Sequence, residues 1–79
     1  MTRIALVDDH QIVRDGLNKI LSAESDLEIV NEFACGSELL KSKSEIDIVV
    51  LDLSMPDISG LDLVEQLQAR PNGPKIVVF

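Results

Sequence analysis

The sequence predicts an α/β fold in which a parallel sheet is covered by helices on both faces. Four short apolar segments alternate along the chain with three segments whose apolar residues recur at helical spacing. Strands that alternate with helices in this way form parallel sheets, and the right-handedness of the crossovers restricts their order. The 79 residues are enough for one small domain, so we expect a single three-layer unit.

Four segments are expected to be strands. Residues 3–7 form a short apolar run that ends at two aspartates, which predicts a buried strand. Residues 27–33 alternate apolar and polar side chains, so this strand is expected to be less buried. Residues 46–51 form the most apolar and β-branched run, which predicts a central and most buried strand ending at Asp52. Residues 75–79 predict the fourth strand.

Three segments are expected to be helices. Residues 12–21 carry apolar side chains on one helical face and polar ones on the other. Ser37 is predicted to cap a short helix around residues 39–40, and Ser59 to cap the third helix. The turn-forming residues 70–74 end that third helix. Its apolar positions are expected to pack in the core, and they are Leu61, Val64 and Leu67.

The chain is acidic. Fourteen acidic and seven basic residues give a formal net charge of −7. Nucleic acid backbones and anionic membranes attract clusters of Lys and Arg, so we expect neither to bind this segment directly. Cys35 is the single cysteine, which excludes an internal disulfide. Neither a signal peptide nor an apolar stretch of membrane-spanning length is visible, so the expected location is the cytoplasm.

Acidic residues follow two of the predicted strands. Asp8 and Asp9 come after the first strand, and Asp52 comes after the third. In an open parallel sheet, ligands bind beyond the carboxyl ends of the strands, where the strand order reverses. With the order 2-1-3-4, the first and third strands are neighbours about 5 Å apart, so the three carboxylates meet in one crevice. Carboxylates that close repel one another unless a cation intervenes, and oxygen-only ligands suit Mg²⁺.

The same arrangement suits phosphoryl transfer. A carboxylate is a competent nucleophile toward phosphorus, and a metal ion neutralises charge on the phosphoryl oxygens. Asp52 follows the strand expected to be most buried, so it is the predicted nucleophile. Each of these acids taken alone is more often a solvated loop residue. The prediction therefore depends on their joint position at the strand ends.

Two stretches of the sequence resemble the receiver domains of two-component response regulators. The first is Asp8-Asp9-His10 followed by Val13-Arg14 and Gly16-Leu17, and the second is Asp52-Leu53-Ser54-Met55-Pro56-Asp57-Ile58-Ser59-Gly60. Both resemble the subgroup that precedes a LuxR/FixJ-type helix-turn-helix, which includes the sugar-phosphate uptake regulators. The resemblance spans the whole chain, and its motifs are specific as a set.

The resemblance implies a flavodoxin-like (CheY-like) fold with strand order 2-1-3-4, an order known from the chemotaxis receiver. Asp52 matches the phosphoacceptor, Asp9 the direct Mg²⁺ ligand, and Asp8 its acidic neighbour, which often acts through water. Ser54 matches the position whose backbone carbonyl completes the metal site with Asp9 and Asp52. The loop after the acceptor is matched by Met55, Pro56 and Gly60.

The resemblance also implies an activity and partners. The expected activity is that of a phosphoacceptor protein, not an enzyme, with self-catalysed phosphotransfer and dephosphorylation at most. The expected partner is a sensor histidine kinase whose phosphohistidine supplies the phosphoryl group to Asp52. The intact protein is expected to regulate transcription and to contact DNA only through an output domain outside residues 1–79.

Receivers of this family continue past the fourth strand. Residues 1–79 are therefore expected to be a partial receiver domain that lacks the final α-β-α portion, with its Ser or Thr after strand four and its Lys after strand five. Lys75 precedes the fourth strand and does not match that lysine. Without a fifth strand, residues 76–79 form a sheet edge with unpaired backbone groups. We expect this edge to pair with another chain or to swap elements in a homodimer.

Two other functions stay open on the sequence. A Mg²⁺-dependent phosphohydrolase with an aspartyl-phosphate, of the haloacid-dehalogenase type, requires Asp-x-Asp where this chain has Asp52-Leu53-Ser54. The other is an interaction module or fragment that keeps the fold without phosphorylation. His10 is expected at a helix start near the site and not as a metal ligand, because no second His or Cys lies at ligand spacing.

Overall fold

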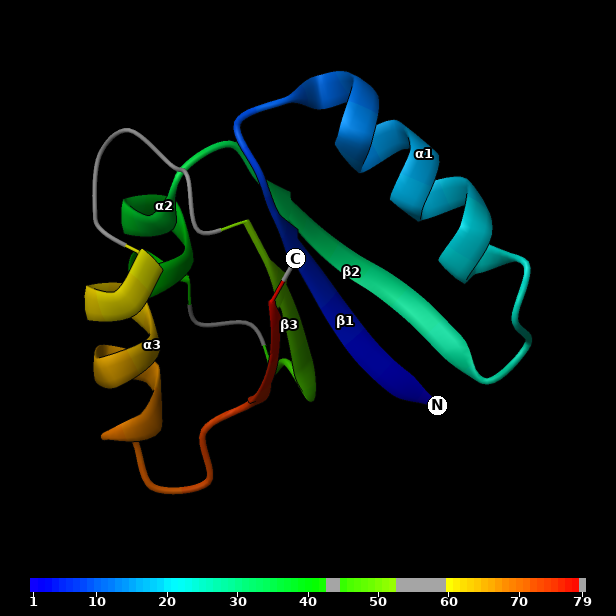
Figure 1. The fold of residues 1–79 in the computed structure, drawn as a ribbon. Coiled ribbons are helices and arrows are strands. Elements are labelled where there is room, and N and C mark those ends of the chain that lie inside the picture. Colours follow the sequence, from blue (N-terminus) through cyan, green and yellow to red (C-terminus); the bar gives the residue numbers. More distant parts are fainter. Residues whose placement is uncertain (43–44, 53–59, 79) are drawn as a thin grey trace.

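The computed structural model describes residues 1–42, 45–52 and 60–78. Figure 1 shows strands and helices alternating along the chain. The strands are β1 (Thr2–Val7), β2 (Leu27–Phe33), β3 (Ile48–Leu51) and β4 (Lys75–Val78). The helices are α1 (Gln11–Ser22), α2 (Gly36–Lys41) and α3 (Gly60–Gln68). This is the predicted alternation. Among the described residues, no helix combines the length and apolar character needed to cross a membrane.

The four strands form one parallel sheet in the order β2-β1-β3-β4. This confirms the predicted order 2-1-3-4, and it makes β1 and β3 neighbours. Their register pairs Ile4 with Ile48 and Val7 with Leu51, so both strands end at the same level of the sheet. The residues that follow the two strands therefore emerge side by side.

The helices cover the sheet unequally. Helix α1 lies on one side and α2 and α3 on the other (Figure 1). The core lies between the sheet and the α2–α3 pair, and its buried members are Ala5, Val7, Phe33, Leu39, Val49, Leu51, Leu63 and Leu67. On the opposite side α1 packs chiefly against β2 and has no buried residue, with Ile12 87% exposed. The apolar face predicted for this helix is therefore only partly covered.

The burial of the strands differs from the sequence expectation. Strand β1 is buried from Ile4 to Val7, whereas β3 alternates between half-buried and buried residues. The third strand is interior, as predicted, but it is not the most buried one. Ile48 and Val50 point to the same side as Ile4 and Leu6, and α1 lies over β2 instead of over β3.

Helix α3 turns a different face to the core than predicted. Leu63 and Leu67 are fully buried and Val64 packs beside them, but Leu61 is 70% exposed. Residues four apart share one helical face, whereas Leu61 lies about 200° around the helix from Leu63. Leu67 and Val64 are confirmed as core residues, and the prediction for Leu61 was wrong. The acidic first turn is confirmed at Asp62.

Two element boundaries also differ from prediction. Helix α2 begins one residue before Ser37, so its N-cap residue is Cys35, which has extended backbone and makes no capping side-chain hydrogen bond. The predicted cap at Ser37 was wrong because this residue lies inside the helix. Strand β3 begins at Ile48 and not at residue 46. The predicted cap at Ser59 lies outside the described residues.

The turn between α3 and β4 has the expected residue types. Asn72 adopts a φ of 59°, a left-handed conformation that Asn tolerates better than most residues. Gly73 follows, and a Cβ atom there would lie 2.5 Å from the carbonyl oxygen of Leu67. A side chain at Gly73 would therefore force the end of α3 away from the turn.

Candidate functional site

The tips of β1 and β3 are held together by backbone hydrogen bonds. The amide of Asp52 donates to the carbonyl of Val7 at 3.0 Å, which extends the β1–β3 ladder by one residue. On the other side of β1, the amide of Asp8 donates to the carbonyl of Phe33 at 3.1 Å. These bonds fix where the acidic residues leave the sheet. The predicted convergence of Asp8, Asp9 and Asp52 therefore follows from the strand register.

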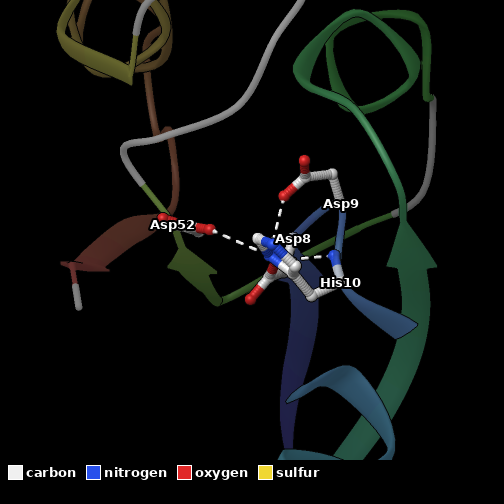
Figure 2. A group of neighbouring side chains, drawn as sticks. All are labelled: Asp8, Asp9, His10 and Asp52. Atoms are coloured by element: carbon white, nitrogen blue, oxygen red, sulfur yellow. Dashed lines mark hydrogen bonds and ion pairs between the residues drawn. The ribbon is translucent and has the colours of Figure 1, made fainter. Parts of the chain in front are cut away.

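Figure 2 shows the three aspartates around one imidazole ring, that of His10. Each of these four residues offers one ligand atom, and the four atoms all lie within 4.8 Å of one another. Asp8 is buried, Asp52 is half-buried and Asp9 is exposed. The group therefore reaches from the end of the sheet to solvent, where an ion has access. We call these four residues the acidic cluster.

His10 lies at the N-cap position of α1, as the sequence predicts, and its ring points into the acidic cluster. Its backbone amide donates to Asp8 Oδ1 at 2.8 Å, and its Nδ1 lies 2.9 Å from the same oxygen. Nδ1 also lies 3.0 Å from Asp9 Oδ1 and 3.8 Å from Asp52 Oδ2. The ring thus contacts or approaches all three carboxylates.

The charges of the cluster favour a cation between the carboxylates. The hydrogen bond from His10 to Asp8, followed by the negative charge of Asp9, raises the pKa of the imidazole above its ordinary value. A protonated ring balances one of the three negative charges. Two negative charges then remain unbalanced in the partly buried cluster, and their proximity is unfavourable without a further positive charge.

The ligand types of the cluster fit a hard divalent cation. Mg²⁺ is held in proteins by one or two carboxylates together with water and phosphate oxygens. The buried carboxylate of Asp8 is anchored by the amide of His10, so it provides a fixed oxygen next to the exposed Asp9. Asp9 and Asp52 provide the other two carboxylates at the solvent side.

Comparison with known proteins connects this geometry to a family. The model of the response regulator receiver domain matches residues 4–79. The chain belongs to this family. It is 44% identical over its whole length to the transcriptional regulatory protein UhpA of Salmonella typhimurium, and 36% identical to LiaR of Bacillus subtilis. The chain spans 40% and 38% of these two relatives.

Solved structures agree with the receiver fold. RcsB from Salmonella enterica, bound to promoter rprA in the presence of the phosphomimetic BeF₃⁻, matches 99% of this chain with a TM-score of 0.90 at 28% identity. The match spans 68% of that chain. The response regulatory domain of protein mrkE from Klebsiella pneumoniae matches 98% of this chain and 65% of its own, with a TM-score of 0.89 at 25% identity. The flavodoxin-like fold predicted from the sequence is therefore confirmed.

Part of the predicted receiver site lies outside the described residues. Ser54, the expected carbonyl ligand, belongs to this part, as do Met55 and Pro56, whereas Gly60 begins helix α3. Within the described part, the structure brings Asp8, Asp9 and Asp52 together. It adds His10, which the sequence placed near the site but did not count as a ligand. Its position directly after Asp9 was the available signal, because a strand-to-helix turn brings consecutive residues to one crevice.

Two hollows of about 360 and 390 Å³ lie at the opposite end of this receiver's sheet. Both are lined by Asp47, Gly73 and Pro74 near the amino ends of β3 and β4. Arg3 there pairs with Asp47 and Glu45, and Arg70 donates to the carbonyl of Leu40. Parallel sheets bind ligands beyond the carboxyl ends of their strands, so we assign the functional site to the acidic cluster.

Proposed function

We propose that Asp52 is the phosphoacceptor of this receiver domain and that Mg²⁺ bound by Asp9 and Asp52, with Asp8 acting directly or through water, supports the transfer. The observation that carries the proposal is the convergence of three carboxylates at the tips of β1 and β3. In the predicted site, the backbone carbonyl of Ser54 completes the metal coordination. A bound Mg²⁺ supplies positive charge that offsets the charge of the phosphoryl oxygens.

The proposed transfer is a displacement at phosphorus. A carboxylate oxygen of Asp52 forms the new O–P bond while the bond between phosphorus and the donor breaks, and the departing atom keeps the electron pair. The backbone bond from the Asp52 amide to Val7 holds the acceptor at the strand tip during this step. Holding the acceptor in place lowers the entropic cost of reaching the transition state.

The proposed donor is the phosphohistidine of a sensor histidine kinase. In the intact protein, transcription would be regulated through a DNA-binding output domain outside residues 1–79. The similar RcsB structure is bound to a promoter, which supports an output on DNA for the longer protein. The net charge of −7 supports the proposal that this segment does not itself contact nucleic acid. We propose the cytoplasm as its compartment.

A phosphorylation assay tests the acceptor. The protein is incubated with Mg²⁺ and acetyl phosphate, and intact mass spectrometry then measures the fraction that carries one phosphoryl group. We expect the modification in the parent chain and its loss in Asp52→Asn. Asp15→Asn is the matched control, because this exposed aspartate lies on α1 outside the acidic cluster. A phosphoryl group that persists in Asp52→Asn would refute the assignment.

The two alternative functions give different results in the same assay. A phosphohydrolase would release inorganic phosphate from a phosphomonoester with steady turnover. The sequence Asp52-Leu53-Ser54 speaks against it, because the second acidic residue of Asp-x-Asp is missing. A phosphorylation-incompetent module would show no added phosphoryl group at any concentration of donor or Mg²⁺.

We also propose that the edge strand β4 pairs with a second copy of the chain. Within residues 1–42, 45–52 and 60–78, β4 has one hydrogen-bonded neighbour, β3. Val77 is 51% exposed and Val78 45%, so the edge is apolar as well as open. Light scattering is expected to show a dimer that Val77→Lys converts to monomer. A strictly monomeric parent chain at high protein concentration would contradict this proposal.

A further inference from the structure

The turn between α3 and β4 contains the single Asn-Gly pair of the sequence. The chain has three asparagines, and only Asn72 is followed by a glycine. Asn18 lies within α1 with its side-chain amide hydrogen-bonded, and Asn31 lies within β2 and is half-buried. Asn72 and Gly73 are both exposed to solvent. Asn72 is therefore the asparagine at which water reaches both the side chain and the following residue.

An asparagine that precedes a glycine can lose its side-chain amide without an enzyme. The main-chain nitrogen of the glycine gives up its proton and bonds to Cγ of the asparagine, while the bond from Cγ to the side-chain nitrogen breaks. That nitrogen takes up the proton and leaves as ammonia, and a five-membered imide remains. Water then opens the ring at one of its two carbonyl carbons, which gives aspartate or isoaspartate. Glycine favours the attack because it has no Cβ beside its nitrogen.

The folded turn holds this pair in a conformation that opposes the reaction. Asn72 has a φ of 59°, and a non-glycine residue with this φ has a ψ of about 30–60°. Such a ψ turns the nitrogen of the next residue away from Cβ, whereas ring closure needs both on the same side of the Cα–C bond. The Gly73 amide also donates to the carbonyl of Arg70 at 3.2 Å, so its proton is engaged. The turn must therefore open before the imide forms.

We propose that Asn72 is a site of spontaneous deamidation and that the closed α3–β4 turn controls its rate. Turns open locally at a lower cost in free energy than the whole fold, so the reaction proceeds from a minor open population of the native protein. The rate falls about tenfold for each 1.4 kcal/mol of opening free energy. The site lies at the amino end of β4, away from the acidic cluster, so the proposal is independent of phosphorylation.

The contacts that protect the pair also make the product disruptive. Isoaspartate adds one atom to the main chain of the turn. The space there is tight, because a Cβ atom at Gly73 would lie 2.5 Å from the carbonyl oxygen of Leu67. Two residues later, the amide of Lys75 anchors the start of β4 to the carbonyl of Asp47 at 3.0 Å. A longer main chain in the turn therefore weakens the attachment of β4 to β3.

Deamidation rates of the folded and the unfolded chain test the proposal. The protein is incubated in the same mildly alkaline buffer with and without guanidinium chloride. Tryptic digestion and tandem mass spectrometry then give the converted fraction of Asn72 over time. We expect conversion at least about tenfold faster in the unfolded chain, because no turn has to open. Equal rates in the two conditions, or no conversion of Asn72 in the unfolded chain, would overturn the proposal.

A variant tests the control by the turn without altering the reacting pair. Pro71→Ala removes the ring that restricts the backbone before Asn72, so it favours the open turn. Conversion should become faster in the folded variant and stay unchanged in the unfolded one. Gln68→Ala is the matched control, because this exposed last residue of α3 lies beside the turn but outside the pair. A folded Pro71→Ala that converts at the rate of the parent chain would overturn the control by the turn.

The effect on the fold is measured on the modified protein. Chromatography separates the isoaspartate form from the parent chain and from the aspartate form, and thermal denaturation gives its melting temperature. Asn72→Asp is the reference, because it adds the same negative charge without lengthening the main chain. We expect the isoaspartate form to melt at a lower temperature than Asn72→Asp. Equal melting temperatures would overturn the inferred weakening of β4.

Discussion

The two ends of strands β1 and β3 differ in how their acidic residues are paired. At the amino end, the Arg3 guanidinium binds both oxygens of Asp47 at 3.2 and 3.4 Å and also pairs with Glu45. At the carboxyl end, three aspartates face one histidine. At one end of this pair of strands both acids thus contact a guanidinium, whereas at the other end three acids share one imidazole.

The difference indicates that the amino end of the sheet has a structural role and the carboxyl end a ligand-binding role. At the amino end, the Arg3 guanidinium holds the Glu45 and Asp47 carboxylates by charge-assisted hydrogen bonds. The pairing holds the pKa of the Asp47 carboxyl below its ordinary value, mainly through the hydrogen bond from Arg3. The carboxyl end keeps acids together that repel in the absence of a cation. This unbalanced end is the one suited to a ligand.

The largest expected effect comes from the core between the two ends. Leu63→Ala should lower the free energy of unfolding by about 2–5 kcal/mol, because it empties space at a fully buried position. Leu61→Ala, at an exposed position of the same helix, should change it by less than about 0.5 kcal/mol. Urea denaturation measures both. Equal losses would show that α3 turns another face to the core. The stability changes at the two strand ends could then no longer be compared with that of a core substitution.

Mg²⁺ should stabilise the protein through the carboxyl end alone. At a free concentration 100 times the dissociation constant, binding to the folded state adds about 2.7 kcal/mol to the free energy of unfolding. Asp9→Asn should abolish most of this gain, whereas Asp47→Asn at the amino end should keep it. Thermal denaturation with and without Mg²⁺ measures the difference. A gain that survives in Asp9→Asn would remove the distinction between the two ends.

Without metal, the two ends should respond oppositely to neutralisation. Asp52→Asn removes one of three crowded charges and should raise the free energy of unfolding by about 0.5–1 kcal/mol in EDTA. Asp47→Asn removes a paired charge and should lower it. Denaturation of both variants in the same buffer makes the comparison. Destabilisation by Asp52→Asn would mean that the acids at the carboxyl end are not in electrostatic conflict.

The smallest expected effect is the pH dependence of the amino end. Because Arg3 lowers the pKa of Asp47 in the folded state from its ordinary value of 3.8, the ion pair stabilises the protein above that value. The contribution is lost as the pH falls through the lowered pKa. The stability difference between the parent chain and Asp47→Asn should therefore be constant near neutrality and shrink in acid. A difference that grows in acid would have the wrong sign for this pairing.

Most of the fold and the main site could be predicted from local patterns. The alternation of apolar strands with amphipathic helices gave the element order, and acids directly after two strands indicated the crevice. The errors concern positions decided by packing. Leu61 and Leu63 are both leucines in one short helix, and only their direction relative to the sheet distinguishes the exposed from the buried one.

His10 shows, within the site, the same difference between what the local sequence predicts and what packing decides. Its place beside the aspartates was visible in the sequence, but the direction of its ring was not. A lone histidine has no ligand spacing to read, so its proximity to Asp52, 42 positions later in the chain, became apparent only in the folded molecule.

The sequence by itself determined the strands, the helices and the supply of carboxylates at two strand ends, because these depend on residue type and local periodicity. Tertiary structure decided which helix face is buried, how much of the sheet α1 covers, and that His10 points into the acidic cluster. These features depend on contacts between segments distant in the chain, and short-range patterns carry no direct information about such contacts.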